Sequence, residues 1–146
     1  AIFIWLYLTD VKKSLCQNAM VLITTVSYIG YFMLSLSTEL KEAILATKIV
    51  YLSGSFIPML FFFTSARICK IRLSKKLTIP LITVQIITFA CVCTIGFSDI
   101  YYKNVSLVFS NGIYILNKEY GPAHILYIST LFGYFILERK FLCYVF

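Results

Sequence analysis

Uncharged apolar runs divide this chain into segments that are long enough to cross a lipid bilayer. Four such runs lie at residues 19–36, 49–66, 77–98 and 120–137, and the second extends back to residue 43 if Lys48 is admitted. A helix needs roughly 20 apolar residues to cross the hydrocarbon core. A fifth run, at residues 1–9, is shorter and resembles the last turns of a crossing helix. The pattern predicts an all-α integral membrane helix bundle of about five spans, the first of them truncated.

We expect these spans to form a single polytopic membrane domain over residues 1–146. Their expected positions are about 1–9, 19–36, 43–66, 77–97 and 121–138. The last six residues, FLCYVF, either finish the fifth span or begin a sixth.

One connection between the spans has the pattern of a β-hairpin. The segments VSLVF and IYIL flank Ser110, Asn111 and Gly112. Asn-Gly between two β-rich runs is a strong hairpin signal, because both residues tolerate the positive φ angles of a tight turn. We therefore predict a hairpin between the fourth and fifth spans.

Basic residues alternate between the two sets of connections. One set carries nine of them and the other carries four. The first set is Lys12, Lys13, Arg67, Lys70, Arg72, Lys75, Lys76, Arg139 and Lys140, and the second is Lys41, Lys48, Lys103 and Lys118. Because loops rich in Lys and Arg stay on the cytoplasmic side, we expect the first set in the cytoplasm. The hairpin and the N-terminus of this multi-pass cell-membrane protein should then lie outside.

The composition agrees with a chain that is embedded in a lipid bilayer. Hydrophobic residues make up 60% of it and charged residues only 13%, about half the charged fraction of a soluble domain. Such values argue against a soluble globule, a disordered tail and a disulfide-rich secreted scaffold. The net charge of +7 is explained by cytoplasmic loops that meet lipid headgroups. The expected partner is therefore the lipid bilayer, and no nucleic acid is needed.

Residues for catalysis or metal binding are sparse. The only histidine is His124, which excludes clusters of histidine ligands. Cys91 and Cys93 are two positions apart in a predicted helix, so their side chains point in different directions. The segment from Ser53 to Ser55 lacks the flanking glycine and the base of a nucleophile elbow. We expect no catalytic site, no metal and no cofactor.

Each predicted span carries polar residues at helical spacing. By span, these stripes are Thr24, Tyr28, Tyr31 and Ser35; Lys48, Tyr51 and Ser55; Thr78, Gln85 and Thr88; and His124, Tyr127, Thr130, Tyr134 and Glu138. Unpaired polar groups in hydrocarbon cost several kcal/mol, so we expect the stripes to face inward. There they either bond neighbouring helices or line a wet cavity.

A cavity near the outer ends of the spans would use the outer residues of these stripes. Lys48 lies just inside the outer end of its span, where a charge is by default a functional hypothesis, although snorkelling to the headgroups also explains it. His124 is expected at a similar depth and could serve a ligand or bond a tyrosine. The candidate ligand contacts are Tyr31, Ser35, Lys48, Tyr51, His124 and Tyr127, with the hairpin at Asn111 and Gly112 as a lid.

The segment GYFMLSLSTELKEAILATKIVYLSGSFIP resembles part of a known family. It is similar to the second and third helices of the seven-helix N-terminal region of bacterial histidine kinases, a module also found on diguanylate cyclases. The matching features are Glu39-x-x-Glu42, Lys48-x-x-Tyr51, Gly54, Phe56-x-Pro58 and, after the hairpin, Tyr120-Gly121-Pro122.

This resemblance implies a sensory input domain of a two-component signal-transduction protein. Such a receptor would detect a small molecule or another extracytoplasmic or membrane signal and pass a helix rearrangement to a cytoplasmic transmitter domain, and a homodimer is compatible with it. A kinase or cyclase domain would lie outside these residues, so the chain itself is not expected to be an enzyme. The alternative is part of a small transporter or permease, although inverted repeats, which are typical of that class, are not visible here.

Overall fold

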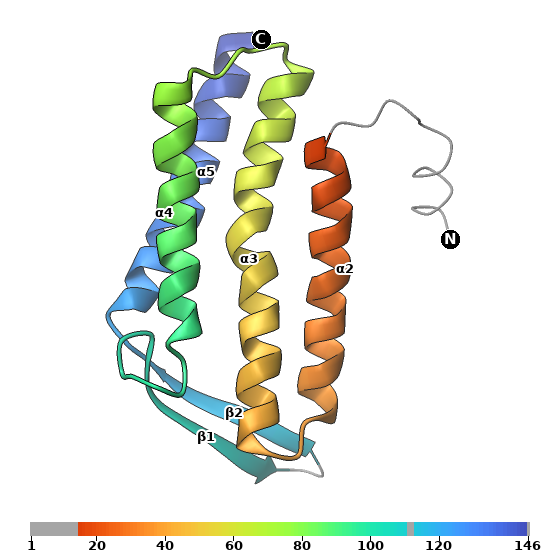
Figure 1. Ribbon diagram of the computed structural model, residues 1–146, viewed down its shortest axis with the longest axis vertical. Helices are drawn as coiled ribbons and strands as arrows, with labels where there is room; N and C mark the ends of the chain where they lie inside the picture. The colour runs from red at the N-terminus through yellow and green to blue at the C-terminus, as the bar shows by residue number, and fades with distance from the viewer. Residues whose placement is uncertain (1–14, 111–112, 146) are drawn as a thin grey trace.

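The computed structural model describes residues 15–110 and 113–145. Its elements, in chain order, are helices α2 (Leu15–Leu36), α3 (Leu40–Ile68) and α4 (Lys75–Cys93), strands β1 (Tyr102–Ser110) and β2 (Ile113–Tyr120), and helix α5 (Ala123–Val145). Helix α3 contacts each of the other three helices, and Figure 1 shows it between α2 on one side and α4 and α5 on the other. The apolar run predicted at residues 1–9 lies outside the described residues.

Three helices in the described part of the chain are long and apolar enough to cross a membrane. They are Cys16–Leu36, Leu40–Ile68 and Lys75–Cys93. Helix α5 is not among them, and its described part includes the consecutive charged residues Glu138, Arg139 and Lys140. The prediction of a mostly helical membrane protein with a hairpin is confirmed. The count of about five spans stays a prediction.

The C-terminal ends of α4 and α5 differ from those expected from hydropathy. Helix α4 ends at Cys93 rather than near residue 97, because the chain turns at Gly96, whose φ of 82° lies in the left-handed region. Helix α5 continues without a break through Val145, so residues 141–145 finish this helix and do not begin another. The apolar runs mark neither helix end, because one passes through the turn at Gly96 and the other stops at Glu138.

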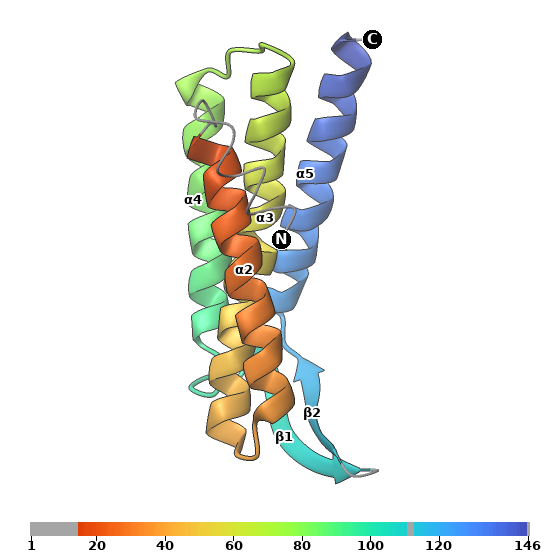
Figure 2. The same ribbon diagram turned by 90° about the vertical axis from the view of Figure 1, so that its right-hand side faces the viewer.

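The two strands form the predicted antiparallel hairpin. Their pairing runs from Tyr102 opposite Tyr120 to Ser110 opposite Ile113, with one irregularity between Tyr102 and Asn104. The turn residues 111–112 lie outside the described residues. Figures 1 and 2 show the hairpin at the end of the bundle where α2 ends and α3 begins. The basic connection between α3 and α4 lies at the opposite end (Figure 1), so the two kinds of polar connection are separated as predicted.

The core consists of two clusters along the bundle. One contains Met59, Leu60 and Phe62 from the C-terminal half of α3 and Tyr134 from the middle of α5. The other contains Val92, Ile95, Tyr101 and Tyr102, and it fastens the end of α4 to the base of the hairpin. The hairpin is therefore packed on the helices by its own aromatic residues.

The predicted polar stripe of α5 faces inward. Tyr134 is 4% exposed, and its hydroxyl donates to the carbonyl oxygen of Leu81 in α4 at 2.9 Å. One turn further on, the carboxylate of Glu138 accepts a hydrogen bond of 2.7 Å from Ser65 in α3. These bonds join α5 to both neighbouring helices.

The stripe of α2 follows the prediction only in part, because Tyr28 is 72% exposed and does not face inward. Many hydroxyls bond within their own helix instead of across helices. For example, Thr24 donates to the carbonyl of Met20 at 2.8 Å and Ser35 to that of Phe32 at 2.7 Å. A Ser or Thr in a helix has a carbonyl one turn earlier within reach, so helical spacing alone does not force its side chain inward.

Gly121 marks a tight corner between the hairpin and α5. Its N–H donates to the carbonyl of Tyr101 at 2.8 Å. A Cβ at this position would lie 2.5 Å from the carbonyl oxygen of Ile100 and 2.6 Å from that of Asp99. Both obstacles are backbone atoms, so they cannot move aside as a flexible side chain would.

We predict that Gly121→Ala destabilises the protein by about 1–3 kcal/mol, because overpacking forces the backbone to shift. The matched control is Gly133→Ala in α5, where nothing lies within 4 Å of the added Cβ. The measurement is the unfolding midpoint of each purified variant in the same detergent. Equal midpoints for the two variants would contradict this description of the corner.

Candidate functional site

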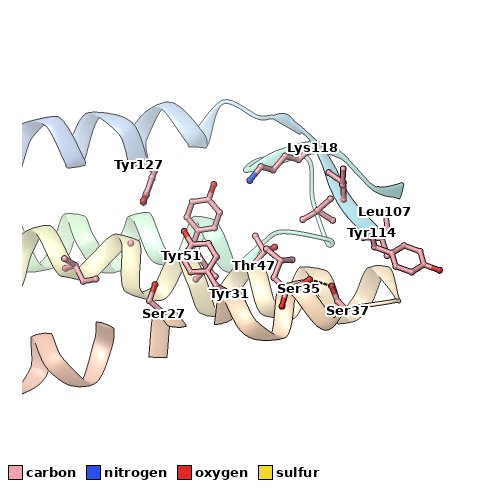
Figure 3. A pocket seen from close by; sticks show the side chains of 16 residues that line it. Ser27, Tyr31, Ser35, Ser37, Thr47, Tyr51, Leu107, Tyr114, Lys118 and Tyr127 are labelled. Carbon is pink, nitrogen blue, oxygen red and sulfur yellow. Dashed lines mark hydrogen bonds between the residues drawn. The ribbon is translucent and has the colours of Figure 1, made fainter. Parts of the chain in front are cut away.

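A cavity of about 710 Å³ lies among α2, α3, the hairpin and the start of α5. This volume falls within the range of roughly 300–1,000 Å³ that is typical of small-molecule sites. Figure 3 shows side chains from all of these elements around the same space. The residues that line it are Ser27, Tyr31, Leu34, Ser35, Ser37, Thr47, Val50, Tyr51, Gly54, Ile57, Leu107, Tyr114, Ile115, Leu116, Lys118 and Tyr127.

Four of the six residues predicted to contact a ligand come together at this cavity. Tyr31 and Ser35 contribute from α2, Tyr51 from α3 and Tyr127 from α5. These four residues therefore lie around one space, although they come from three different helices. Whether these residues bind a ligand stays a prediction.

Lys48 and His124 lie beside the cavity and do not line it. The Nζ atom of Lys48 is 4.7 Å from the ring centroid of Phe97, which follows α4. The face of α3 that lines the cavity includes Thr47 and Tyr51, and Lys48 is about 100° around the helix from Thr47. Helical spacing placed Lys48 near the cavity but not on its inner wall.

His124 belongs to an aromatic stack behind the cavity. Its ring lies 3.9 Å from that of Tyr120, nearly parallel, and 5.9 Å from that of Tyr127. Its Nδ1 atom is 3.4 Å from the hydroxyl oxygen of Tyr101. Of the two roles considered for this histidine, the hydrogen bond to a tyrosine is the one that the structure shows.

Tyr51 of α3 contacts residues of both the hairpin and α5. Its ring packs edge to face against Tyr101 at 5.3 Å, Tyr102 at 6.3 Å and Tyr127 at 5.2 Å. The hydroxyl of Tyr102 donates to the hydroxyl of Tyr51 at 2.7 Å. Burial raises the pKa of both Tyr101 and Tyr102, so their hydroxyls stay protonated and able to donate.

Tyr127 reaches across to α3 at a glycine. A Cβ on Gly54 would lie 2.7 Å from the hydroxyl oxygen of Tyr127, so the absence of a side chain there makes room for it. The Tyr127 side chain lines the cavity, and its hydroxyl forms no hydrogen bond with another described residue. This hydroxyl is therefore available to a bound molecule.

Lys118 is the one charged residue among those that line the described cavity, and it was not among the predicted contacts. It lies on β2, and its Nζ atom is 5.9 Å from the ring centroid of Tyr51, 5.5 Å from that of Tyr102 and 5.8 Å from that of Tyr120. Figure 3 shows its side chain extending from the hairpin toward the helices. Burial lowers the pKa of Lys118, since the charged form loses hydration. Strand alternation pairs Lys118 with Leu116 on one face, but the sequence does not say which face packs on the helices.

The described residues assemble no group of three or more His, Cys, Asp or Glu side chains that could hold a metal ion. Cys16, Cys69, Cys91 and Cys93 are free thiols. The groups that the cavity does present are tyrosine, serine and threonine hydroxyls, one ammonium group and apolar side chains. Together they can bind a small molecule that has both polar and apolar parts.

Comparison with known families adds one finding. The model of a family described as the N-terminal 7TM region of histidine kinase matches residues 1–144. No curated protein and no solved structure matches the chain.

The hydroxyl pair between Tyr51 and Tyr102 should hold the hairpin against α3. We predict that Tyr102→Phe keeps the ring packing but loses about 1 kcal/mol of stability, the usual contribution of one hydrogen bond. Hydrogen exchange of the β1 and β2 amides should become faster in this variant. The matched control is Tyr120→Phe on the partner strand, because Tyr120 is 52% exposed and its hydroxyl forms no hydrogen bond with a described residue.

A double-mutant cycle with Tyr51→Phe separates the bond from other effects. If Tyr51→Phe and Tyr102→Phe have fully additive effects on hydrogen exchange in the hairpin, their hydroxyl pair does not hold the hairpin against α3.

Proposed function

The chain belongs to the family of N-terminal seven-transmembrane regions of histidine kinases, and from this premise we propose that it is the sensory input domain of a bacterial membrane kinase. It detects an extracytoplasmic or membrane-borne signal and passes a helix rearrangement to the cytoplasmic transmitter. Catalysis belongs to the kinase domain, to which a region of this family is linked. Residues 1–146 act as one polytopic unit in this proposal.

The observation that carries the proposal is the construction of the cavity. Its walls come from parts far apart in the chain: α2 and α3, the hairpin, and the start of α5. A molecule that fills it contacts all of these parts at once. Such a ligand stabilises the helix packing that it fits best and so shifts the population between packings.

Helix α5 offers a direct route from the cavity to the other end of the bundle. It contacts the cavity through Tyr127 and continues as one helix to Val145. Near its far end, Glu138 accepts the hydrogen bond from Ser65. A change in the position of Tyr127 against α3 is therefore transmitted along α5 to its C-terminal end. We place this end, with its basic residues, in the cytoplasm beside the transmitter.

We propose that Tyr31, Ser35, Tyr51 and Tyr127 contact the ligand. Lys48 and His124 act indirectly in this scheme. Lys48 holds Phe97 at the corner after α4, and His124 stacks beside Tyr127. The hairpin covers the cavity, although its predicted lid residues, Asn111 and Gly112, lie outside the described residues.

The proposal predicts that Tyr127→Ala weakens the response of the full-length kinase to its signal at least about tenfold, since loss of one good contact of roughly 1.4 kcal/mol changes an equilibrium tenfold. Growth conditions are first screened for one that changes autophosphorylation in membranes, and the variants are then compared under that condition. The control is Tyr28→Ala in α2, which removes a tyrosine that is 72% exposed and does not line the cavity. Membrane levels of the protein should be equal in all samples.

A full response in both Tyr127→Ala and Tyr51→Ala would remove the cavity from the signalling mechanism. A response that Tyr28→Ala reduces as strongly as Tyr127→Ala would point to general damage of the bundle instead.

A further inference from the structure

Lys118 gives the cavity a positive charge that no described residue neutralises. No described carboxylate forms an ion pair with it, and the nearest acid in the chain, Glu119, accepts a hydrogen bond of 2.9 Å from Asn104 instead. The aromatic rings around Nζ lie at 5.5–5.9 Å. This is close to the limit of about 6 Å for a cation–π interaction, so their stabilisation of the charge is weak.

The ammonium group also has three N–H donors, and it is half-buried, where a charge without a counter-ion is costly. An anion that enters the cavity would supply both the missing charge and the missing acceptors. The described residues that line the cavity include no Asp or Glu that would repel such an anion.

Two hydroxyl groups can add to the binding of the same anion. Tyr51 accepts the hydrogen bond from Tyr102, which leaves the Tyr51 proton free for another acceptor. Tyr127, whose ring packs against that of Tyr51 at 5.2 Å, also lines the cavity and has a hydroxyl that no described residue bonds. The Lys118 ammonium and these two hydroxyls are all hydrogen-bond donors. Together they bind a carboxylate or phosphate oxygen more strongly than a neutral or cationic group.

The remainder of the wall is suited to an apolar body. Leu34, Val50 and Ile57 contribute from α2 and α3, and Leu107 and Leu116 from the hairpin. These side chains cannot satisfy a second charge. A ligand that matches the whole cavity is therefore charged at one end and apolar at the other.

We propose that the cavity binds an amphiphilic anion, a molecule with one carboxylate or phosphate group and a short apolar body, and that Lys118 contacts the charged group. This inference rests on the proposed sensory function and names the chemical class of its ligand. The anion can come from a free amphiphile or from the headgroup of an anionic lipid. Both sources offer the same chemistry to Lys118.

Binding of octanoate tests this directly. The full-length protein is placed in nanodiscs of zwitterionic phosphatidylcholine, and octanoate or octanol is titrated by calorimetry, with empty nanodiscs as the blank. We expect octanoate to bind at least about tenfold more tightly than octanol. Lys118→Met should weaken octanoate binding at least about tenfold, and Lys118→Arg should restore most of it.

The matched control is Lys103→Met, which removes an exposed lysine of the same hairpin and should leave octanoate binding unchanged. Equal binding of octanoate and octanol to the wild type, or unchanged octanoate binding in Lys118→Met, overturns the proposal. If Lys118→Met does not fold, the comparison of octanoate with octanol on the wild type still decides.

Nanodiscs that contain phosphatidylglycerol distinguish the two sources. Competition with octanoate that depends on Lys118 identifies a lipid headgroup as the anion, whereas octanoate binding without competition identifies a free amphiphile, and either result supports the proposal. Binding is measured without kinase output. Octanoate binding that depends on Lys118, together with a full signal response in Tyr127→Ala and Tyr51→Ala, would keep the anion site and reject the sensory role.

Discussion

A polypeptide in hydrocarbon must satisfy its own backbone hydrogen bonds, and this constraint decides where every part of the molecule can lie. Helices cross the membrane, and irregular or extended backbone collects at their ends. Helix α3 has 29 residues and is about 44 Å long, which exceeds the hydrocarbon thickness of roughly 30 Å. Some of its turns therefore stand outside the hydrocarbon, where the hairpin can pack against them without leaving strand edges in lipid.

The packing around Tyr51 joins the hairpin and α5 to α3 beside the cavity. One ring contacts both the base of the hairpin and α5, and the hydroxyl bond to Tyr102 fixes the hairpin at that place. The same attachment carries Lys118 over the cavity. The position of the charge, the shape of the cavity and the start of α5 thus depend on one aromatic cluster, so a ligand that disturbs it affects all three.

Much of this architecture could be predicted from the sequence, because it follows from local rules. The apolar runs predicted the helices α2 to α5, and the Asn111-Gly112 pair predicted the hairpin between α4 and α5. Helical spacing brought Tyr31, Ser35, Tyr51 and Tyr127 to one cavity. What could not be predicted depends on tertiary contacts. Lys118 enters the site because the face of β2 that carries Tyr114, Leu116 and Lys118 lines the cavity, and strand alternation alone leaves the choice of face open. The exposure of Tyr28 likewise depends on how α2 packs and not on its spacing from other polar residues.

The central claim is that the hairpin and its cavity face the outside while the basic connection between α3 and α4 faces the cytoplasm. The most direct measurement is labelling of intact cells with a membrane-impermeant maleimide, using Ser106→Cys in the hairpin and Ser74→Cys in the basic connection, both exposed positions, in a full-length protein whose native cysteines are replaced by serine. The account predicts that Ser106→Cys is labelled in intact cells and Ser74→Cys only after the membrane is permeabilised. Labelling of Ser74→Cys in intact cells, with Ser106→Cys protected, would contradict it.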